Sequence, residues 1–218
     1  MKKRMVWMMK VALIIVLAGC AFGKKMTFEN KEIDAGNTVY KPVAVVFHDQ
    51  RPEVLSGREK PSYCGHSNST GQIGYNIQTA SGKPLATEFT NALVASLTKR
   101  QITAEAIMAT HTQPANSILL AFKNGKMERL LYFTISLWDA TMRPKFSTIE
   151  YEVVYDLDLK VYDREGTMLA NGHGKNFWRV EDPDLATSNN KLQRYADSVF
   201  VREIRSLLKD PKVQESVK

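Results

Sequence analysis

Two long segments in the second half of the chain alternate apolar and polar residues with a period of two. Successive side chains of a β-strand point to opposite faces, so this pattern predicts strands with one buried and one exposed face. A turn at residues 163–166 separates the second segment from a third, residues 167–180, and we expect an antiparallel meander. The apolar positions are Leu131, Phe133, Ile135, Leu137, Tyr151, Val153, Tyr155, Leu157, Leu159 and Val161.

Other segments show the helical period. Apolar residues recur at three- and four-residue steps over residues 84–99, where Pro84 suits a first helical position. The same pattern covers residues 189–208, and Pro211 follows it. Residues 116–126 carry a shorter version, for which we expect a short helix. The chain is therefore expected to hold two long helices and one short one.

Three short apolar segments, residues 43–47, 72–79 and 102–108, complete the expected strands. The first has no polar alternation, which is typical of a strand buried on both faces, and Pro52 lies just beyond its end. Residues 53–71 hold glycine, proline and many small polar residues, so they predict a long loop.

The order of these elements predicts the α+β class. We expect a mainly antiparallel sheet with a C-terminal three-strand meander, two long helices packed on one face, and the opposite face partly exposed to solvent. In the last strand Gly172 and Gly174 flank His173, which indicates a bulge or a close approach of another backbone. Trp138, Trp178 and Tyr132 lie on predicted strands and are expected in the core.

The N-terminus has the three parts of an export signal in order. Residues 1–4 carry the positive charge, residues 11–17 are apolar, and Ala18 and Gly19 are the small residues of a cleavage site. A transmembrane helix would need about 20 apolar residues. Lys10 interrupts any longer span here, so we expect residues 1–19 to be removed on export.

The segment Leu17-Ala18-Gly19-Cys20 resembles the lipobox of bacterial lipoproteins. The resemblance implies a thioether between Cys20 and diacylglycerol, cleavage before Cys20, and acylation of the new amine. It also favours the outer membrane, because an aspartate does not follow the cysteine. Residues 20–39 are polar and without a sustained period, and we expect them to be a lipidated tether. Residues 40–218 are then a single domain facing the periplasm.

Charge and cysteine content narrow the function. Loss of residues 1–19 lowers the formal charge from +7 to +3, since four basic residues and no acidic ones leave. The remaining basic residues are scattered, which argues against nucleic-acid binding. With Cys20 acylated, Cys64 has no cysteine partner in the chain, so no internal disulfide is expected.

Asp49 and Arg51 lie two positions apart after the first strand. On an extended backbone they point to the same side, so we expect an ion pair that either anchors the loop or serves binding at the surface. The lipobox, the strand with Val43, Val45 and Phe47 closed by this Asp-x-Arg pair, and the element order resemble YajG-like envelope accessory lipoproteins of Gram-negative bacteria. That resemblance implies an accessory role without catalysis.

Few residues could carry chemistry. No G-x-S-x-G elbow is present, and the glycine pairs at 71–74 and 172–174 lack the context of a nucleotide-binding loop. Cys64 would form a thiol–imidazole pair with His66 or His48 only if the fold oriented them. No H-E-x-x-H or C-x-x-C motif supports a metal site, and we expect no catalytic residue, metal or cofactor. The residues that could gather as ligands are His48, Asp49, Cys64 and His66, with His111 and His173 further away.

Three functions remain open. We favour a non-catalytic accessory or binding module, anchored by lipid, with an envelope protein as partner. The alternatives are an envelope hydrolase using Cys64 and His66, or a subunit of an envelope transport or flagellar assembly. An oriented Cys-His-acid set would favour the enzyme, an exposed aromatic patch the binding module, and an uncovered edge strand the subunit.

Overall fold

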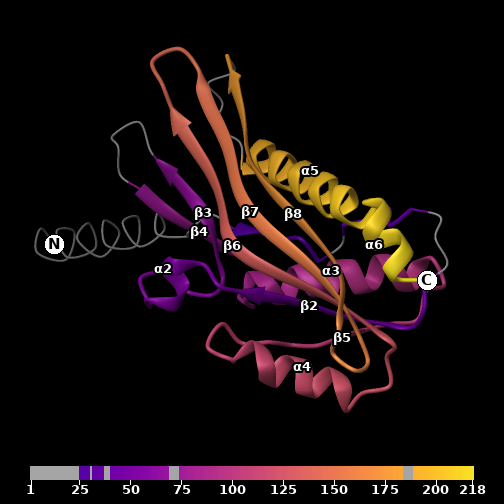
Figure 1. Cartoon of the computed structure of the whole chain (residues 1–218). Coiled ribbons are helices and arrows are strands. Elements are labelled where there is room, and N and C mark those ends of the chain that lie inside the picture. Colours follow the sequence, from indigo (N-terminus) through magenta and orange to yellow (C-terminus); the bar gives the residue numbers. More distant parts are fainter. Residues whose placement is uncertain (1–24, 30, 37–39, 69–73, 184–188) are drawn as a thin grey trace, which may run out of the picture.

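The computed structural model of the chain describes residues 25–29, 31–36, 40–68, 74–183 and 189–218. The expected signal cleavage and the lipidation of Cys20 lie outside the described residues. Among the described residues, no helix is long and apolar enough to cross a membrane. They form one eight-stranded sheet with helices against both of its faces (Figure 1).

The sheet combines short early strands with three long late ones. The strands are β1 (Lys25–Met26), β2 (Val43–Asp49), β3 (Tyr63–Asn68), β4 (Gly74–Thr79), β5 (Ala104–Ala106), β6 (Arg129–Pro144), β7 (Ile149–Asp163) and β8 (Met168–Asp182). The helices are α2 (Pro52–Leu55), α3 (Leu85–Lys99), α4 (Ala115–Lys123), α5 (Asn189–Leu208) and α6 (Pro211–Ser216).

Strand β6 is the centre of the sheet. Along one edge it pairs antiparallel with β7 over its whole length, and β7 pairs with β8, so the predicted meander is present. Along the other edge β6 pairs in parallel first with β2, up to Ile135, and then with β3, from Ala140 to Met142. β6 therefore changes partner over residues 136–139.

The α+β class is confirmed, but the expectation of a mainly antiparallel sheet is wrong. Four of the seven pairings between described strands are parallel: β1 with β4, β2 with β5, β2 with β6 and β3 with β6. Alternation reveals which face of a strand is buried, not the direction of its neighbour. β2 is buried at all seven positions, which is the pattern of parallel strands covered on both faces.

Opposite faces of β2 carry two hydrophobic clusters. Phe47 faces the main core, where it packs against Phe89 of α3, and Phe89 stacks on Phe200 of α5 with ring centroids 4.1 Å apart. The two long helices thus share one face, as expected (Figure 1). Val46 points the other way, into a smaller cluster with Ile118 of α4. The second face is therefore covered where α4 lies.

Helix α5 lies close over two glycines of β8. A Cβ on Gly174 would overlap the Glu203 carboxylate, and one on Gly172 would lie 3.1 Å from the Leu207 side chain. The bulge or close backbone approach expected at these glycines is therefore wrong, because it is side chains of α5 that lie close to them. The irregularity in this ladder lies elsewhere, between Val161 and Tyr162.

Three segments belong to the folded domain although the sequence indicated otherwise. In the expected tether, Phe28 and Ile33 are buried in the main core. The expected loop 53–71 contains most of α2 and all of β3. Beyond Pro211, α6 adds Val213 to the core. Each segment places isolated apolar residues into the core without a period that the sequence alone would reveal.

A substitution at Phe89 tests whether the apolar side of α3 is part of the main core. Phe89 is fully buried among Phe28, Phe47, Trp138 and Phe200. Phe89→Ala should therefore lower the free energy of unfolding by about 3–5 kcal/mol, through lost transfer energy and a cavity. Urea titration of the chain from residue 21 measures it. Phe177→Ala, at a largely exposed position of β8, is the control and should change stability by less than about 0.5 kcal/mol.

Candidate functional site

The expected ion pair between Asp49 and Arg51 is present and buried. Arg51 donates from Nε to Asp49 Oδ1 at 2.9 Å and from Nη2 to Asp49 Oδ2 at 2.7 Å. Its third nitrogen, Nη1, donates to the Tyr63 carbonyl at 2.9 Å and to the Trp138 carbonyl at 3.4 Å. The pair therefore ties the end of β2 to β3 and β6.

The burial of Asp49 and Arg51 distinguishes the two roles expected for the pair, which were anchoring the loop and binding at the surface. Arg51 is 0 % exposed and Asp49 2 %, so neither offers a surface for binding, and the anchoring role fits. Burial works to lower the pKa of Arg51, but the hydrogen bonds and charge of Asp49 outweigh it and raise the pKa above its ordinary value. The guanidinium stays charged where it anchors the strand.

Cys64 and His66, expected in a loop, lie on β3. The ladder of β3 with β4 is irregular between Tyr63 and Gly65, and Gly65 lies so close to β6 that a Cβ there would overlap the Ala140 backbone. Cys64 is buried in the main core, and its thiol donates to the Ser62 carbonyl at 3.4 Å. Burial raises the pKa of that thiol. The hydrolase alternative thus gains no support at Cys64.

His66 instead joins a half-buried polar cluster on the outer face of the sheet. Its Nδ1 lies 3.3 Å from Asp139, which also accepts from the Tyr63 hydroxyl at 2.9 Å and the Thr141 hydroxyl at 3.2 Å. The hydrogen bond to Asp139 raises the pKa of His66. Burial works to raise the pKa of Asp139, but these partners hold it below its ordinary value. Every member of the cluster is partnered within it.

The four residues weighed together as metal ligands do not converge. His48 and Asp49 alternate on β2, Cys64 faces the core and His66 the outer face. Among the described residues, the ligand atoms that do come together belong to Asp156, Asp158 and His173 on the exposed side of β7 and β8. His173 lies 2.8 Å from Asp158, and Lys175 lies 2.8 Å from Asp156. These carboxylates are already paired with side chains of the chain.

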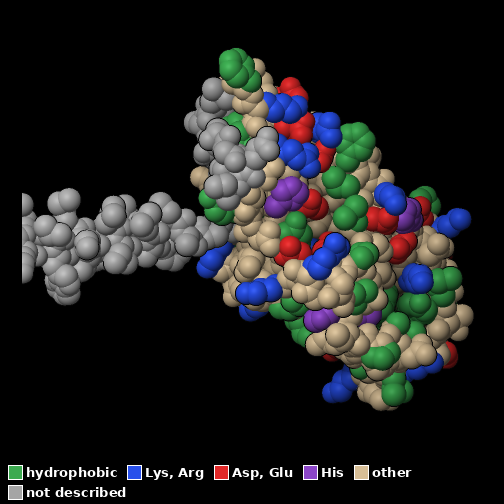
Figure 2. Space-filling model, turned by 90° about the vertical axis from the view of Figure 1, so that its left-hand side faces the viewer, with side chains coloured by type: hydrophobic (Ala, Val, Ile, Leu, Met, Phe, Trp, Pro, Cys, Tyr) green, Lys and Arg blue, Asp and Glu red, His purple; other side chains and the backbone are tan. Residues whose placement is uncertain are grey.

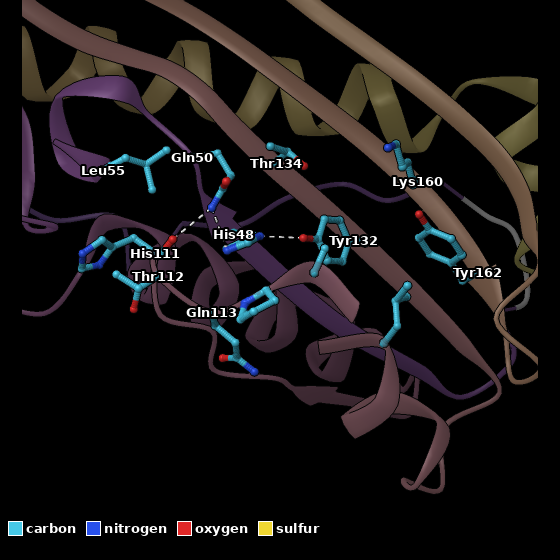
Figure 3. A pocket seen from close by; sticks show the side chains of 13 residues that line it. His48, Gln50, Leu55, His111, Thr112, Gln113, Tyr132, Thr134, Lys160 and Tyr162 are labelled. Carbon is cyan, nitrogen blue, oxygen red and sulfur yellow. Dashed lines mark hydrogen bonds between the residues drawn. The ribbon is translucent and has the colours of Figure 1, made fainter. Parts of the chain in front are cut away.

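A cavity of about 580 Å³ lies on the face of the sheet opposite the main core (Figure 3). β2, β6 and β7 form its floor, and α2, the segment before α4 and the start of α4 form its walls. Figure 3 shows His48, Gln50 and His111 gathered at one end and Lys160 with Tyr162 at the other. Its lining residues are His48, Gln50, Leu55, His111, Thr112, Gln113, Pro114, Ala115, Leu119, Tyr132, Thr134, Lys160 and Tyr162.

A hydrogen-bond relay fixes the polar end of the cavity. The Gln50 Nε2 donates to the carbonyls of Asp49 and His111, both at 3.1 Å, which identifies that atom as the amide nitrogen. The same nitrogen lies 2.8 Å from His48 Nε2. An amide nitrogen can only donate, so His48 Nε2 accepts and the ring proton resides on Nδ1.

This tautomer of His48 determines whether the Tyr132 hydroxyl donates or accepts in the hydrogen bond between them. His48 Nδ1 donates to the Tyr132 hydroxyl oxygen at 2.6 Å, which leaves the hydroxyl proton of Tyr132 for another acceptor. No described side chain accepts that proton. Burial lowers the pKa of His48, against the raising effects of Asp49 and nearby carbonyls, so the imidazole is neutral near pH 7. Burial also raises the pKa of Tyr132 to about 12, so its hydroxyl stays protonated.

The other end of the cavity carries a positive charge. Lys160 pairs with Tyr132 across the β6 and β7 ladder, and its ammonium forms no ion pair with any described residue. Thr134 and Tyr162 add hydroxyl groups on the same face, and Leu55 and Leu119 add apolar wall. The cavity thus presents one cation and a free hydroxyl donor beside apolar surface.

The sequence indicated only part of this site. His48 stood out as a candidate ligand, and Trp138 and Tyr132 were expected in the core, where both are buried, Trp138 in the main cluster and Tyr132 in the smaller one. Gln50, Lys160 and Tyr162 were missed. Residues 43–47 were expected to be buried on both faces, and this expectation already implied that something covers the second face of the strand. The side chains of β2 that turn away from the main core point toward this cavity.

Comparisons with known proteins show the fold alone. No family model and no curated protein matches the chain. Protein XCC0632 from Xanthomonas campestris, of the family model DUF330, is similar with a TM-score of 0.51 at 10 % identity, over 88 % of this chain and 95 % of that one. The resemblance to YajG-like lipoproteins stays a prediction.

Two further solved structures are more distant in fold. Lipoprotein GNA1162 from Neisseria meningitidis has a TM-score of 0.28 at 13 % identity, over 76 % of this chain and 99 % of that one. A neuraminyllactose-binding hemagglutinin homolog from Helicobacter pylori has a TM-score of 0.38 at 10 % identity, over 89 % of this chain and 95 % of that one.

Alkylation of Cys64 tests its placement. In the chain from residue 21 it is the single cysteine. Because the thiol is buried with a raised pKa, iodoacetamide at pH 8.5 should react with the native chain at least about 100-fold more slowly than with the urea-unfolded chain. Ser147→Cys, at an exposed position, is the control and should react rapidly. Native Cys64 reacting at the unfolded rate would restore the hydrolase alternative.

Proposed function

We propose that this chain is a lipid-anchored, periplasm-facing accessory module of the bacterial envelope, held in the outer membrane, that binds a small ligand in the cavity beside Tyr132. It acts without catalysis and without nucleic acid, and passes or presents its ligand to an envelope protein partner. The lipobox at residues 17–20 supports the anchor. The cavity supports the binding role.

The unclaimed hydroxyl proton of Tyr132 is the observation that carries the binding role. It points from a buried residue at the floor of a cavity, and Lys160 supplies a cation on the neighbouring strand. A ligand with a carboxylate or phosphate beside Lys160 and a further acceptor beside the Tyr132 hydroxyl would engage both, and charge-assisted hydrogen bonds are about twice as strong as neutral ones. The apolar walls would cover a small hydrocarbon or aromatic part of the ligand.

The same relay supports binding rather than catalysis. Both ring nitrogens of His48 are engaged, one by Gln50 and one by Tyr132, so the imidazole has no free nitrogen to take a proton from a substrate. The cavity lining contains no cysteine or serine that could serve as a nucleophile. What the relay offers a ligand is the Tyr132 hydroxyl, held in place as a donor by His48.

A second candidate function rests on the edge of the meander. Among the described strands β8 pairs only with β7, so its other edge of 15 residues carries no strand. Unpaired edges accept strands of partner proteins. This favours, as the alternative, a subunit of an envelope transport or flagellar assembly that docks through β8.

Cys20→Ser tests the anchor. The Cys20 thiol is the group available for the thioether, so the variant should remain an uncleaved precursor without acyl chains. Metabolic labelling with palmitate followed by fractionation of envelopes measures this. Cys64→Ser is the matched control and should be labelled like the unchanged chain. Palmitate incorporation into Cys20→Ser at the control level would contradict lipid anchoring.

Lys160→Met tests the cavity. Phenyl phosphate serves as the probe, because it joins an anionic group to a small apolar ring, and benzyl alcohol is its uncharged counterpart. Lys160→Met should weaken binding of phenyl phosphate about tenfold, the equivalent of about 1.4 kcal/mol, and leave benzyl alcohol unchanged. NMR titration of amide shifts measures both. Lys212→Met on α6 is the control. Equal weakening of both probes, or none, would contradict an anion site at Lys160.

A further inference from the structure

The turn between β6 and β7 exposes a phenylalanine completely. The Lys145 N–H donates to the Thr148 carbonyl at 2.8 Å, which leaves Phe146 and Ser147 as a two-residue turn. Phe146 is 103 % exposed, so its ring is not packed against any of the described residues. Turns of this length favour glycine, asparagine and aspartate, and a bare aromatic ring there contributes nothing to folding.

The same end of the sheet holds a second hairpin and a second exposed ring. In Figure 1 the β6–β7 turn stands at the upper end of the sheet, and the described ends of β3 and β4, at Asn68 and Gly74, lie on the same side of the sheet below it. Tyr75 of β4 is 43 % exposed and stands opposite Ser67, which in turn lies opposite Met142 of β6. Tyrosine, with its polar tip, is enriched where membrane meets water.

Strand directions fix the side from which the N-terminal chain arrives. β6 runs toward its hairpin tip, β3 is parallel to β6, β4 is antiparallel to β3, and β1 is parallel to β4. β1 therefore runs away from the tip. The chain that joins Cys20 to Lys25 enters β1 from the side of the hairpins.

The length of that chain limits where the membrane can lie. Residues 25–36 belong to the domain, so five residue steps connect Cys20 to Lys25, and fully extended they span at most about 18 Å. Lys25 pairs with Gln78, which stands opposite Tyr63. The turn at Phe146 lies about 23 Å further along the strands, because Gln78 is one residue from Ile77, which is level with Gly65 and Ala140, and Phe146 is six residues beyond Ala140. The tip therefore stands slightly beyond the furthest reach of the anchor.

The charged side chains near the β6–β7 turn are paired with one another. Arg143 lies 3.0 Å from Glu150 and 2.9 Å from Glu152, and Lys145 pairs with Glu150 and Glu181. Figure 2 shows blue and red side chains interleaved below a hydrophobic group at the upper tip. Because these charges are already paired, the exposed Phe146 ring is the group at this turn that remains to be buried, and an apolar environment would bury it.

We propose that the domain stands on the membrane with the β6–β7 turn and the adjoining ends of β3 and β4 facing the bilayer, and that the Phe146 ring inserts into the leaflet that carries the Cys20 lipid. This rests on the lipid anchor of the proposed function. The short connection keeps the domain close to the leaflet, and the exposed rings fix its orientation there.

A fluorescent label beside the tip tests this orientation. Ser147→Cys keeps Phe146, and the buried Cys64 leaves the new thiol as the reactive one. The full lipidated chain carries an environment-sensitive NBD label at 147 in vesicles of phosphatidylethanolamine and phosphatidylglycerol. We expect a blue shift and quenching by spin-labelled lipid. Lys212→Cys, labelled on α6, is the control and should show neither, and Phe146→Ser should reduce both effects at 147.

The outcomes separate this proposal from the anchor on which it rests. A chain that floats with the vesicles but gives the same quenching at 147 as at 212 would overturn the orientation and leave the anchor standing. A chain that does not float would overturn both. A benzophenone label at 147 that crosslinks in intact envelopes to a protein rather than to lipid would also overturn the orientation.

Discussion

The buried guanidinium of Arg51 holds the two halves of the sheet together. β6 pairs with β2 as far as Ile135 and with β3 from Ala140, so its edge is unpaired in between. Arg51 spans this gap, bound to Asp49 and to the carbonyls of Tyr63 and Trp138. A buried charge that loses its partner costs about 3–5 kcal/mol, so the two residues act as one unit. Asp49, Arg51 and the two carbonyls together form the joint between the two halves of the sheet.

The end of β2 serves two purposes by strand alternation. Asp49 and Arg51 turn toward the joint, while His48 and Gln50 form the relay at the cavity on the other face. Four consecutive residues thus anchor the sheet and orient the Tyr132 hydroxyl. The hydrogen bonds that hold Gln50 and His48 in place orient the Tyr132 hydroxyl before any ligand arrives, which favours binding.

Cavity and hairpin tip lie far apart along the same strand. His48 stands opposite Thr134 of β6, and Phe146 follows twelve residues later, a distance of up to about 40 Å along an extended strand. In the orientation proposed for the anchored domain, the cavity opens well away from the leaflet. A ligand or an envelope partner would then meet it in the periplasm, and β8 would offer its edge to the side.

The sequence by itself determined the long helices, the meander and the ion pair, because each depends on spacing within one segment: the helical period of residues 84–99 and 189–208, the alternation of residues 131–161, and the two-residue step from Asp49 to Arg51. Only the tertiary structure decided the parallel pairing of β2 and β3 with β6, the burial of Phe28 and Cys64, and the cavity. These arise from contacts between segments distant in the chain. A local pattern records how a segment presents its faces, and the partner of each face is chosen only when the whole core packs.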